Sequence, residues 1–146
     1  MAALLDVNAL IALVDRDHVG HSAITRWFRR HHRAGWATCP LTENGMVRVL
    51  SQAGYPSGRR TPAEIVEILV ALKAVFAQSH DFWSDDISLT DSSVFDAALI
   101  AGSNQVTDAY LLGLASQHAA KLVSFDRTLP WHAIRGGSKD LILSPT

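Results

Sequence analysis

The chain has 146 residues, of which 48% are hydrophobic and 18% are charged. This length and composition predict a single domain over residues 1–146 with its own core, and they exclude a highly charged disordered tail. The formal net charge is −1, so any nucleic-acid site must be a local feature, because the chain has no overall basic excess.

Short apolar runs alternate with helical patterns along the first half of the chain. The apolar run 2–5 predicts a buried strand, and the spacing of Leu10, Ile11 and Val14 predicts a helix over 7–14. The elements expected next are a helix over 20–32, a short strand over 36–39 that Pro40 ends, and a helix over 41–50.

The second half of the chain continues this alternation. Residues 53–60 are rich in Gly, Pro and Ser and predict a loop, and Thr61-Pro62-Ala63-Glu64 is a capping box that predicts a helix from there to residue 76. We expect strands over 80–83, 121–125 and 141–143, a short helix over 92–100 and a buried helix over 105–118. The whole pattern predicts a parallel α/β sheet with helices on both faces.

The N-terminus and the cysteine content indicate where such a protein works. Asp6 interrupts the first apolar run before a secretory signal could form, and no apolar run approaches the roughly 18 residues of a membrane span. The single cysteine, Cys39, excludes an intramolecular disulfide and a cysteine-rich zinc site. We therefore expect a soluble cytoplasmic protein.

Four acidic residues occupy positions that favour a shared site. Asp6 and Asp126 each follow an apolar run that predicts a strand, and adjacent parallel strands would bring their carboxylates together although they are far apart in sequence. Glu43 and Asp108 each lie near the start of a predicted helix, where the helix dipole favours a negative charge. If all four converge, their mutual repulsion requires protons or a divalent cation, and an all-oxygen ligand set favours Mg²⁺ or Mn²⁺. Metal-assisted hydrolysis of phosphodiester bonds is the chemistry that such a site implies.

Taken one at a time, these acids also have simpler interpretations. An aspartate after a strand most often caps the next helix, which is the commoner role for a residue such as Asp6. Glu43 and Asp108 could each be an exposed acid in a first helical turn, and Asp15 and Asp17 are expected to be solvated loop residues. The joint pattern of the four acids is what favours a site.

That joint pattern resembles the four acidic motifs of PIN domains, and most closely those of the VapC ribonuclease toxins of bacterial toxin–antitoxin modules. The resemblance rests on four segments in family order, which are Leu4-Leu5-Asp6-Val7-Asn8-Ala9-Leu10-Ile11, Thr42-Glu43, Gln105-Val106-Thr107-Asp108-Ala109-Tyr110-Leu111 and Val123-Ser124-Phe125-Asp126-Arg127. It covers nearly the whole chain. It implies a PIN-like three-layer α/β/α fold with a short parallel sheet of four or five strands.

The resemblance also implies an activity and its residues. Asp6, Glu43, Asp108 and Asp126 would be the catalytic and Mg²⁺- or Mn²⁺-binding acids of an endoribonuclease that cleaves RNA with metal-activated water. Residues that would support these acids are Asn8, Thr42, Thr107 and Ser124. The family further implies a homodimer and a cognate antitoxin protein that blocks the site.

Basic residues offer candidate contacts to RNA. Arg29, Arg30 and Arg33 belong to a cluster at the end of the second predicted helix, and Arg48 follows Glu43 by five positions. Arginine suits bidentate contact with phosphate, although cations at a helix C-terminus are also stabilised by the dipole alone. Both interpretations of the cluster stay open at this point.

Other classes of protein share parts of this pattern. Another metal-dependent nuclease, such as a DNA nuclease, would need the same acids. A receiver-like domain also ends a strand with an aspartate, but it needs a lysine after a late strand, whereas Lys121 precedes its predicted strand. A catalytically silent interaction domain is the remaining alternative. Zinc is disfavoured because the seven histidines lack ligand spacing.

Overall fold

The computed structural model describes residues 2–146. Its helices are α1 (Val7–Val14), α2 (His21–His31), α3 (Pro40–Leu50), α4 (Pro62–Val75) and α5 (Val106–Gln117). Its strands are β1 (Ala3–Leu5), β2 (Trp36–Thr38), β3 (His80–Phe82), β4 (Lys121–Val123) and β5 (Ile142–Leu143). Short 3₁₀ turns complete the connections, at η1 (His32–Ala34), η2 (Ala97–Leu99), η3 (Ser103–Gln105), η4 (Trp131–Ala133) and η5 (Lys139–Leu141).

The five strands form one parallel sheet in the order β3-β2-β1-β4-β5. The chain builds β1, β2 and β3 outward in one direction and then returns to place β4 on the other side of β1. The strand order therefore reverses between β1 and β4. In open α/β sheets, ligands bind beyond the carboxyl ends of the strands at such a reversal.

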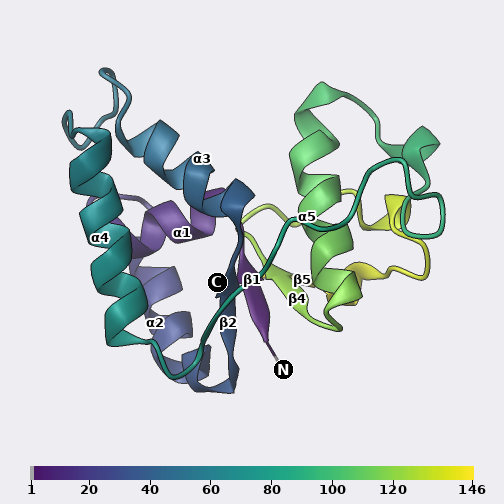
Figure 1. Cartoon of the computed structure of the whole chain (residues 1–146), viewed down its shortest axis with the longest axis horizontal. Helices are drawn as coiled ribbons and strands as arrows, with labels where there is room; N and C mark the ends of the chain where they lie inside the picture. Colours follow the sequence, from purple (N-terminus) through teal and green to yellow (C-terminus); the bar gives the residue numbers. More distant parts are fainter. Residues whose placement is uncertain (1) are drawn as a thin grey trace.

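Helices cover both faces of the sheet, as the alternation of elements predicted. Helices α1 to α4 lie on one side of the strands and α5 lies on the other (Figure 1). Successive strand residues point to opposite faces, so Leu5 and Trp36 belong to the core on the α1–α4 side, whereas Leu4 and Leu122 belong to the core on the α5 side. The result is a three-layer α/β/α arrangement.

The predicted helix over 92–100 is wrong. The structure has turns there, and only Ala97–Leu99 forms a 3₁₀ turn. The backbone groups of this segment bond to a distant segment instead: the Asp96 N–H donates to the Ala133 carbonyl at 2.8 Å, and the Arg135 N–H donates to the Val94 carbonyl at 2.8 Å. These long-range bonds take the groups that a helix would use internally.

The other predicted elements are confirmed, with ends that differ by at most two residues. Strands are the elements that shift most, because β4 ends at Val123 and leaves Ser124 and Phe125 outside the sheet. Within residues 2–146, no helix is long and apolar enough to cross a membrane.

Candidate active site

The site begins at the reversal point of the sheet, where β1 and β4 end side by side. Leu5 pairs with Val123, and the Asp6 N–H donates to the Val123 carbonyl at 3.1 Å. Asp6 is therefore the first residue beyond β1 and lies beside Ser124, the first residue beyond β4. Their adjacency follows directly from the parallel register of the two strands.

Asp6 has two roles in the local structure. Its carboxylate caps α1 by accepting the Ala9 N–H at 2.7 Å, as the simpler interpretation predicted. Its side chain is also buried, with only 7% of the residue exposed. Burial, with the negative charges of Asp108 and Asp126, raises the pKa of Asp6 to about 6, against the opposing effect of the Ser124 hydroxyl and the Ala9 N–H. This carboxyl group is thus both anchored and costly to ionise.

Asp108 and Asp126 complete a group of three aspartates. Asp108 lies in the first turn of α5 and is half-buried, and its pKa is raised by burial and by the charge of Asp126. Asp126 is exposed, and its Oδ1 accepts the Thr128 N–H at 2.8 Å and the Thr128 hydroxyl at 2.6 Å. The charges of Asp108 and Asp126 thus act on Asp6, and the charge of Asp126 acts on Asp108, which places the three carboxyl groups in one neighbourhood.

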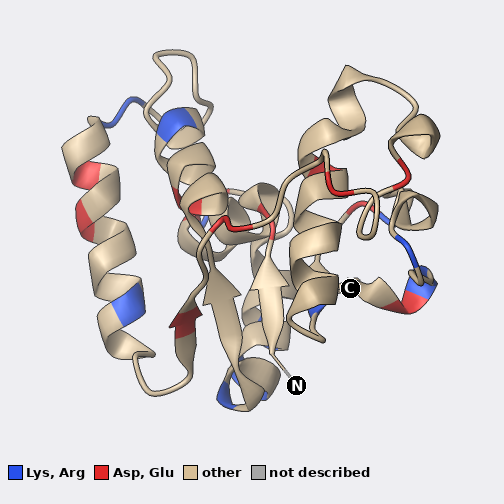
Figure 2. Ribbon diagram, turned by 45° about the vertical axis from the view of Figure 1, so that its right-hand side comes forward, with Lys and Arg blue, Asp and Glu red and all other residues tan. Residues whose placement is uncertain are grey.

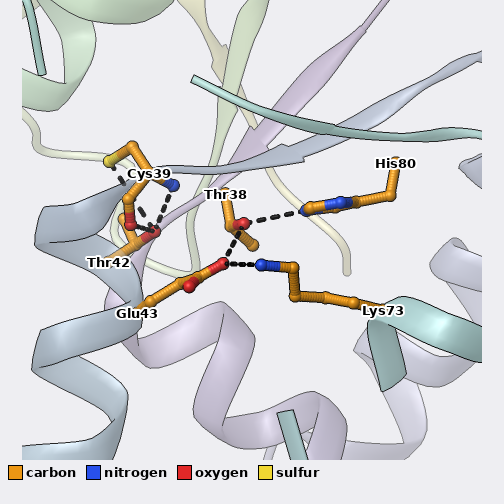
Figure 3. Close-up of polar contacts among 6 residues, drawn as sticks. All are labelled: Thr38, Cys39, Thr42, Glu43, Lys73 and His80. Atoms are coloured by element: carbon orange, nitrogen blue, oxygen red, sulfur yellow. Dashed lines mark hydrogen bonds and ion pairs between the residues drawn. The ribbon is translucent and has the colours of Figure 1, made fainter. Parts of the chain in front are cut away.

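Glu43, the fourth predicted acid, has partners that the three aspartates do not share. It is in the first turn of α3, and its Oε2 accepts the Thr38 hydroxyl at 2.6 Å and the Lys73 ammonium at 2.9 Å. Figure 3 shows both donors meeting the same carboxylate oxygen, Thr38 from the end of β2 and Lys73 from α4. Glu43 is not among the causes of the raised pKa values of Asp6 and Asp108. An ion pair with α4 therefore neutralises the fourth acid.

His80 extends this arrangement on the sheet side. Its Nε2 lies 2.8 Å from the Thr38 hydroxyl oxygen. The single hydroxyl proton of Thr38 goes to Glu43, so Nε2 must be the donor in this contact. Burial and the Lys73 charge lower the pKa of His80, which keeps its ring neutral near pH 7. A directed chain of hydrogen bonds thus runs from His80 through Thr38 to Glu43.

The three aspartates suit a hard divalent cation by chemistry. They offer only carboxylate oxygens, and the raised pKa values of Asp6 and Asp108 indicate that the group gains from added positive charge. Across residues 2–146, no three His, Cys, Asp or Glu side chains already stand at coordinating positions. Mg²⁺ is compatible with such an open arrangement, because it keeps several waters and takes only one or two carboxylates directly.

The four predicted supporting residues have different surroundings. Ser124 is buried beside Asp6 and its hydroxyl accepts the Asp126 N–H at 3.1 Å, so it lies between two of the acids. Asn8 is exposed, and its side-chain oxygen lies 3.1 Å from His18 Nε2. Thr42 is buried, but its hydroxyl bonds to the Cys39 backbone and caps α3, whereas Thr107 is exposed in α5. Of the four, Ser124 is the one that the structure places in contact with the aspartates.

The predicted RNA-contacting arginines lie at two different ends of the molecule. Helix α2 carries Arg29 and Arg30 in its last turn and leads through Arg33 in η1 into the start of β2. This position is the amino edge of the sheet, opposite the carboxylates, and Figure 2 shows basic residues there and acidic residues beyond the strand tips. Arg48 is exposed in the last turn of α3. Any contact of the α2 cluster with RNA would therefore be remote from the acids.

Sequence reasoning missed three residues of the Glu43 environment, and it misjudged Asp15. Thr38 ends β2 as a buried polar residue, so the strand-end argument used for Asp6 would have found it. Lys73 and His80 come from distant elements and carry no local signal.

Asp15 was expected to be solvated, but it is buried. Its carboxylate accepts the Tyr55 hydroxyl at 2.6 Å and the Ser57 hydroxyl at 2.8 Å, and these bonds tie the loop 53–60 to the end of α1.

Comparisons with known proteins agree with this fold. A model of the PIN domain matches residues 3–133. Ribonuclease VapC44 of Mycobacterium tuberculosis (strain H37Rv) is 44% identical over 139 residues, which cover 95% of this chain and 96% of that protein. Ribonuclease VapC38 of the same strain is 48% identical over 124 residues, which cover 85% of this chain and 84% of that protein.

A solved structure of FitAB bound to an IR36 DNA fragment shares the fold, with a TM-score of 0.56 and 17% identity over 98% of this chain and 94% of that chain.

This chain belongs to the PIN domain family, because the family model matches most of its length. The parallel sheet, with aspartates at its reversal point, agrees with that assignment. Within that family, the extent of its similarity to the M. tuberculosis proteins places it with the VapC ribonucleases.

Proposed function

We propose that this chain is a Mg²⁺- or Mn²⁺-dependent endoribonuclease that hydrolyses RNA phosphodiester bonds. The observation that carries the proposal is the position of three aspartates near the reversal point of the sheet: Asp6 and Asp126 follow the adjacent strands β1 and β4, and Asp108 lies in the first turn of α5. Burial, with the charges of neighbouring aspartates, raises the pKa values of Asp6 and Asp108. Relatives that are named ribonucleases, with 44% and 48% identity, support RNA as the substrate.

The acids have distinct tasks in this proposal. Asp6, Asp108 and Asp126 would hold the divalent cation, with Glu43 as the fourth acid that the family resemblance implies. When bound, the cation would supply positive charge that activates the attacking water and stabilises the leaving oxygen. The Ala9 N–H fixes the direction of the Asp6 carboxylate, and Ser124 supports the same group from the position just after β4. The exposed Asp126 is the acid that an RNA strand would approach first.

The proposal includes a biological setting. As a VapC-type protein, the chain would be the toxin of a type II toxin–antitoxin module that acts in the cytoplasm, with a cognate antitoxin protein as its inhibitor and a homodimer as its assembly. Asn8, Thr42 and Thr107 remain proposed supporting residues, and Arg29, Arg30, Arg33 and Arg48 remain proposed contacts to RNA outside the site itself.

A cleavage assay on a mixed RNA pool tests the proposal. The purified chain is incubated with Mg²⁺ or Mn²⁺, with a chelator, and as the Asp6→Asn and Asp108→Asn variants. We expect cuts that need the cation and are lost in both variants, while Asp140→Asn, an exposed aspartate in η5, cuts like the wild type. Full activity in the Asp108→Asn variant would contradict the proposal, and cleavage of single-stranded DNA with RNA left intact would replace RNA as the substrate.

A further inference from the structure

Lys73 connects α4 to the first turn of α3 through Glu43. Its ammonium lies 2.9 Å from Glu43 Oε2, and the two side chains are only 30% and 15% exposed. The same ammonium lies 4.9 Å from the centroid of the Phe82 ring, on β3. Two contacts from different elements therefore hold this lysine, which distinguishes it from a freely solvated surface ion pair.

Thr38 holds Glu43 independently of Lys73. The Thr38 hydroxyl donates to the same Oε2 atom at 2.6 Å and is itself held by His80 Nε2 at 2.8 Å (Figure 3). Thr38 is fully buried at the end of β2. The position of the Glu43 carboxylate is thus fixed from the sheet even where no lysine is present, so the role of Lys73 is mainly one of charge.

The positive charge of Lys73 makes the surroundings of Glu43 differ from those of the three aspartates. The negative charges of Asp108 and Asp126 act on Asp6, whereas the negative charge of Glu43 faces the Lys73 ammonium. A carboxylate paired with an ammonium at 2.9 Å presents nearly no net charge to its surroundings. In the metal-free chain, the fourth acid is therefore already occupied by a cation that the protein itself supplies.

We propose that Lys73 competes with the divalent cation for Glu43 and so sets the cation concentration at which the site fills. This inference rests on the proposed function, because it assumes that the acids bind Mg²⁺ or Mn²⁺. It assigns Lys73 as a positioning residue, which acts through Glu43 and not on the substrate. Filling of the site then requires Glu43 to exchange the Lys73 ammonium for the metal ion, or the metal ion to bind the three aspartates alone.

Removal of Lys73 changes the affinity for the cation through two opposed contributions. Removal of Lys73 eliminates a positive charge that repels the incoming dication and frees Glu43 to attract it, which tightens binding. The same change removes one of two restraints on the Glu43 side chain, which loosens binding, but Thr38 still holds that carboxylate. Charge therefore dominates, and we expect Lys73→Met to bind the cation about tenfold more tightly than the wild type.

Calorimetric titration with Mn²⁺ and with Mg²⁺ tests this inference without any substrate. The variants are Lys73→Met, Lys73→Arg, and Lys139→Met, which makes the same change of charge at an exposed position before β5. Lys73→Gln replaces Lys73→Met if the methionine variant does not fold, as judged by circular dichroism. We expect tighter cation binding only in Lys73→Met or Lys73→Gln. The dissociation constants of Lys73→Arg and Lys139→Met should stay within about twofold of the wild-type value. In a Glu43→Gln background, the gain from Lys73→Met should disappear.

Three results would overturn the inference in different ways. If Asp6→Asn abolishes cation binding but Lys73→Met binds like the wild type or more weakly, Lys73 has no competing role and the proposed metal site stands. If the folded wild type and Lys73→Met both bind neither cation at millimolar concentration, both the inference and the proposed function fail. A lower melting temperature of Lys73→Met with unchanged cation affinity would assign the lysine a purely structural role.

Discussion

Individual carboxyl groups at the carboxyl edge of the sheet are stabilised by different partners. The raised pKa of Asp6, about 6, lets that group take up a proton, Glu43 pairs with Lys73, and Asp126 accepts two hydrogen bonds from Thr128. Two unit charges 4 Å apart repel by about 4 kcal/mol at an effective dielectric constant of 20. These partners explain how a chain with four acids near one edge can fold before any cation binds.

Asp6→Asn should stabilise the metal-free chain above pH 6. Folding raises the pKa of Asp6 from 3.8 to about 6, so ionisation of this group destabilises the fold progressively as the pH rises from 4 to 6, by roughly 3 kcal/mol in full. Asparagine carries no charge, and its side-chain oxygen can still cap α1 by accepting the Ala9 N–H. Urea unfolding in chelator at pH 4 and pH 8 measures this effect. A variant that is less stable than the wild type at pH 8 would contradict the burial and repulsion assigned to Asp6.

Tyr55→Phe should destabilise the chain at pH 7 and do so less in acid. Burial opposes ionisation of Asp15, but hydrogen bonds from Tyr55, Ser57 and the Asp17 N–H outweigh it and lower the pKa of the Asp15 carboxyl. The stabilisation from a lowered pKa is complete above pH 4 and is lost as the pH falls through the folded-state pKa. Loss of one hydrogen bond to a charged group costs about 1.5–3 kcal/mol.

Tyr110→Phe is the matched control for this prediction. The Tyr110 hydroxyl is buried and, within residues 2–146, donates no hydrogen bond to a carboxylate. Its removal should therefore change the free energy of unfolding little at any pH. Denaturant midpoints at pH 7 and pH 3 compare the two variants, and an equal loss from Tyr55→Phe at both pH values would argue against an ionised, hydroxyl-bound Asp15.

Among the elements of the fold, helix α5 packs closely against Phe95 at the position of Gly113. A Cβ atom added to Gly113 would lie 2.3 Å from Cζ of Phe95, whose ring packs against this helix. Alanine normally favours a helix over glycine by about 1 kcal/mol, but overpacking of a core costs about 1–3 kcal/mol. We expect Gly113→Ala to lower the thermal stability, while Gly54→Ala, where a Cβ would meet nothing within 4 Å, leaves it nearly unchanged. A melting temperature raised by Gly113→Ala would show that Phe95 moves aside freely.

The same contact shows which elements sequence reasoning could predict. Helices α1 and α4 follow from local spacing and caps, such as the Thr61 side chain that accepts the Glu64 N–H. The segment 92–100 resembles a helix locally, but Phe95 pairs with Ile134 and packs against Gly113, two contacts with distant parts of the chain. Local propensity fails where such long-range contacts determine the backbone.

At the scale of the whole molecule, the site is a consequence of strand order. Ligands bind at the reversal point of a parallel sheet, beyond the carboxyl ends of its strands. Because two predicted strands end in acids, this rule predicted that Asp6 and Asp126 lie at one edge of the sheet. It could not predict Lys73, because the pairing of α4 with α3 depends on helix packing that leaves no pattern in the sequence. The ion pair of Glu43 is therefore visible only in the structure.

Divalent cations should stabilise the whole fold. A ligand that binds only the native state at ten times its dissociation constant adds about 1.4 kcal/mol, which raises the melting temperature of a chain this long by roughly 3–6 °C. We expect Mg²⁺ to produce this shift in the wild type and not in Asp108→Asn, as measured by differential scanning calorimetry. An equal shift in both proteins would place the binding elsewhere.

The most direct test of the central claim is the position of a bound Mn²⁺ ion. Crystals grown with Mn²⁺ and measured near the manganese absorption edge would give an anomalous difference map. We predict a peak at the carboxyl edge of β1 and β4, about 2.2 Å from a carboxylate oxygen of Asp6 and of at least one of Asp108 and Asp126. A well-ordered crystal with no anomalous peak at these aspartates, or with its only peak at another part of the chain, would contradict the account.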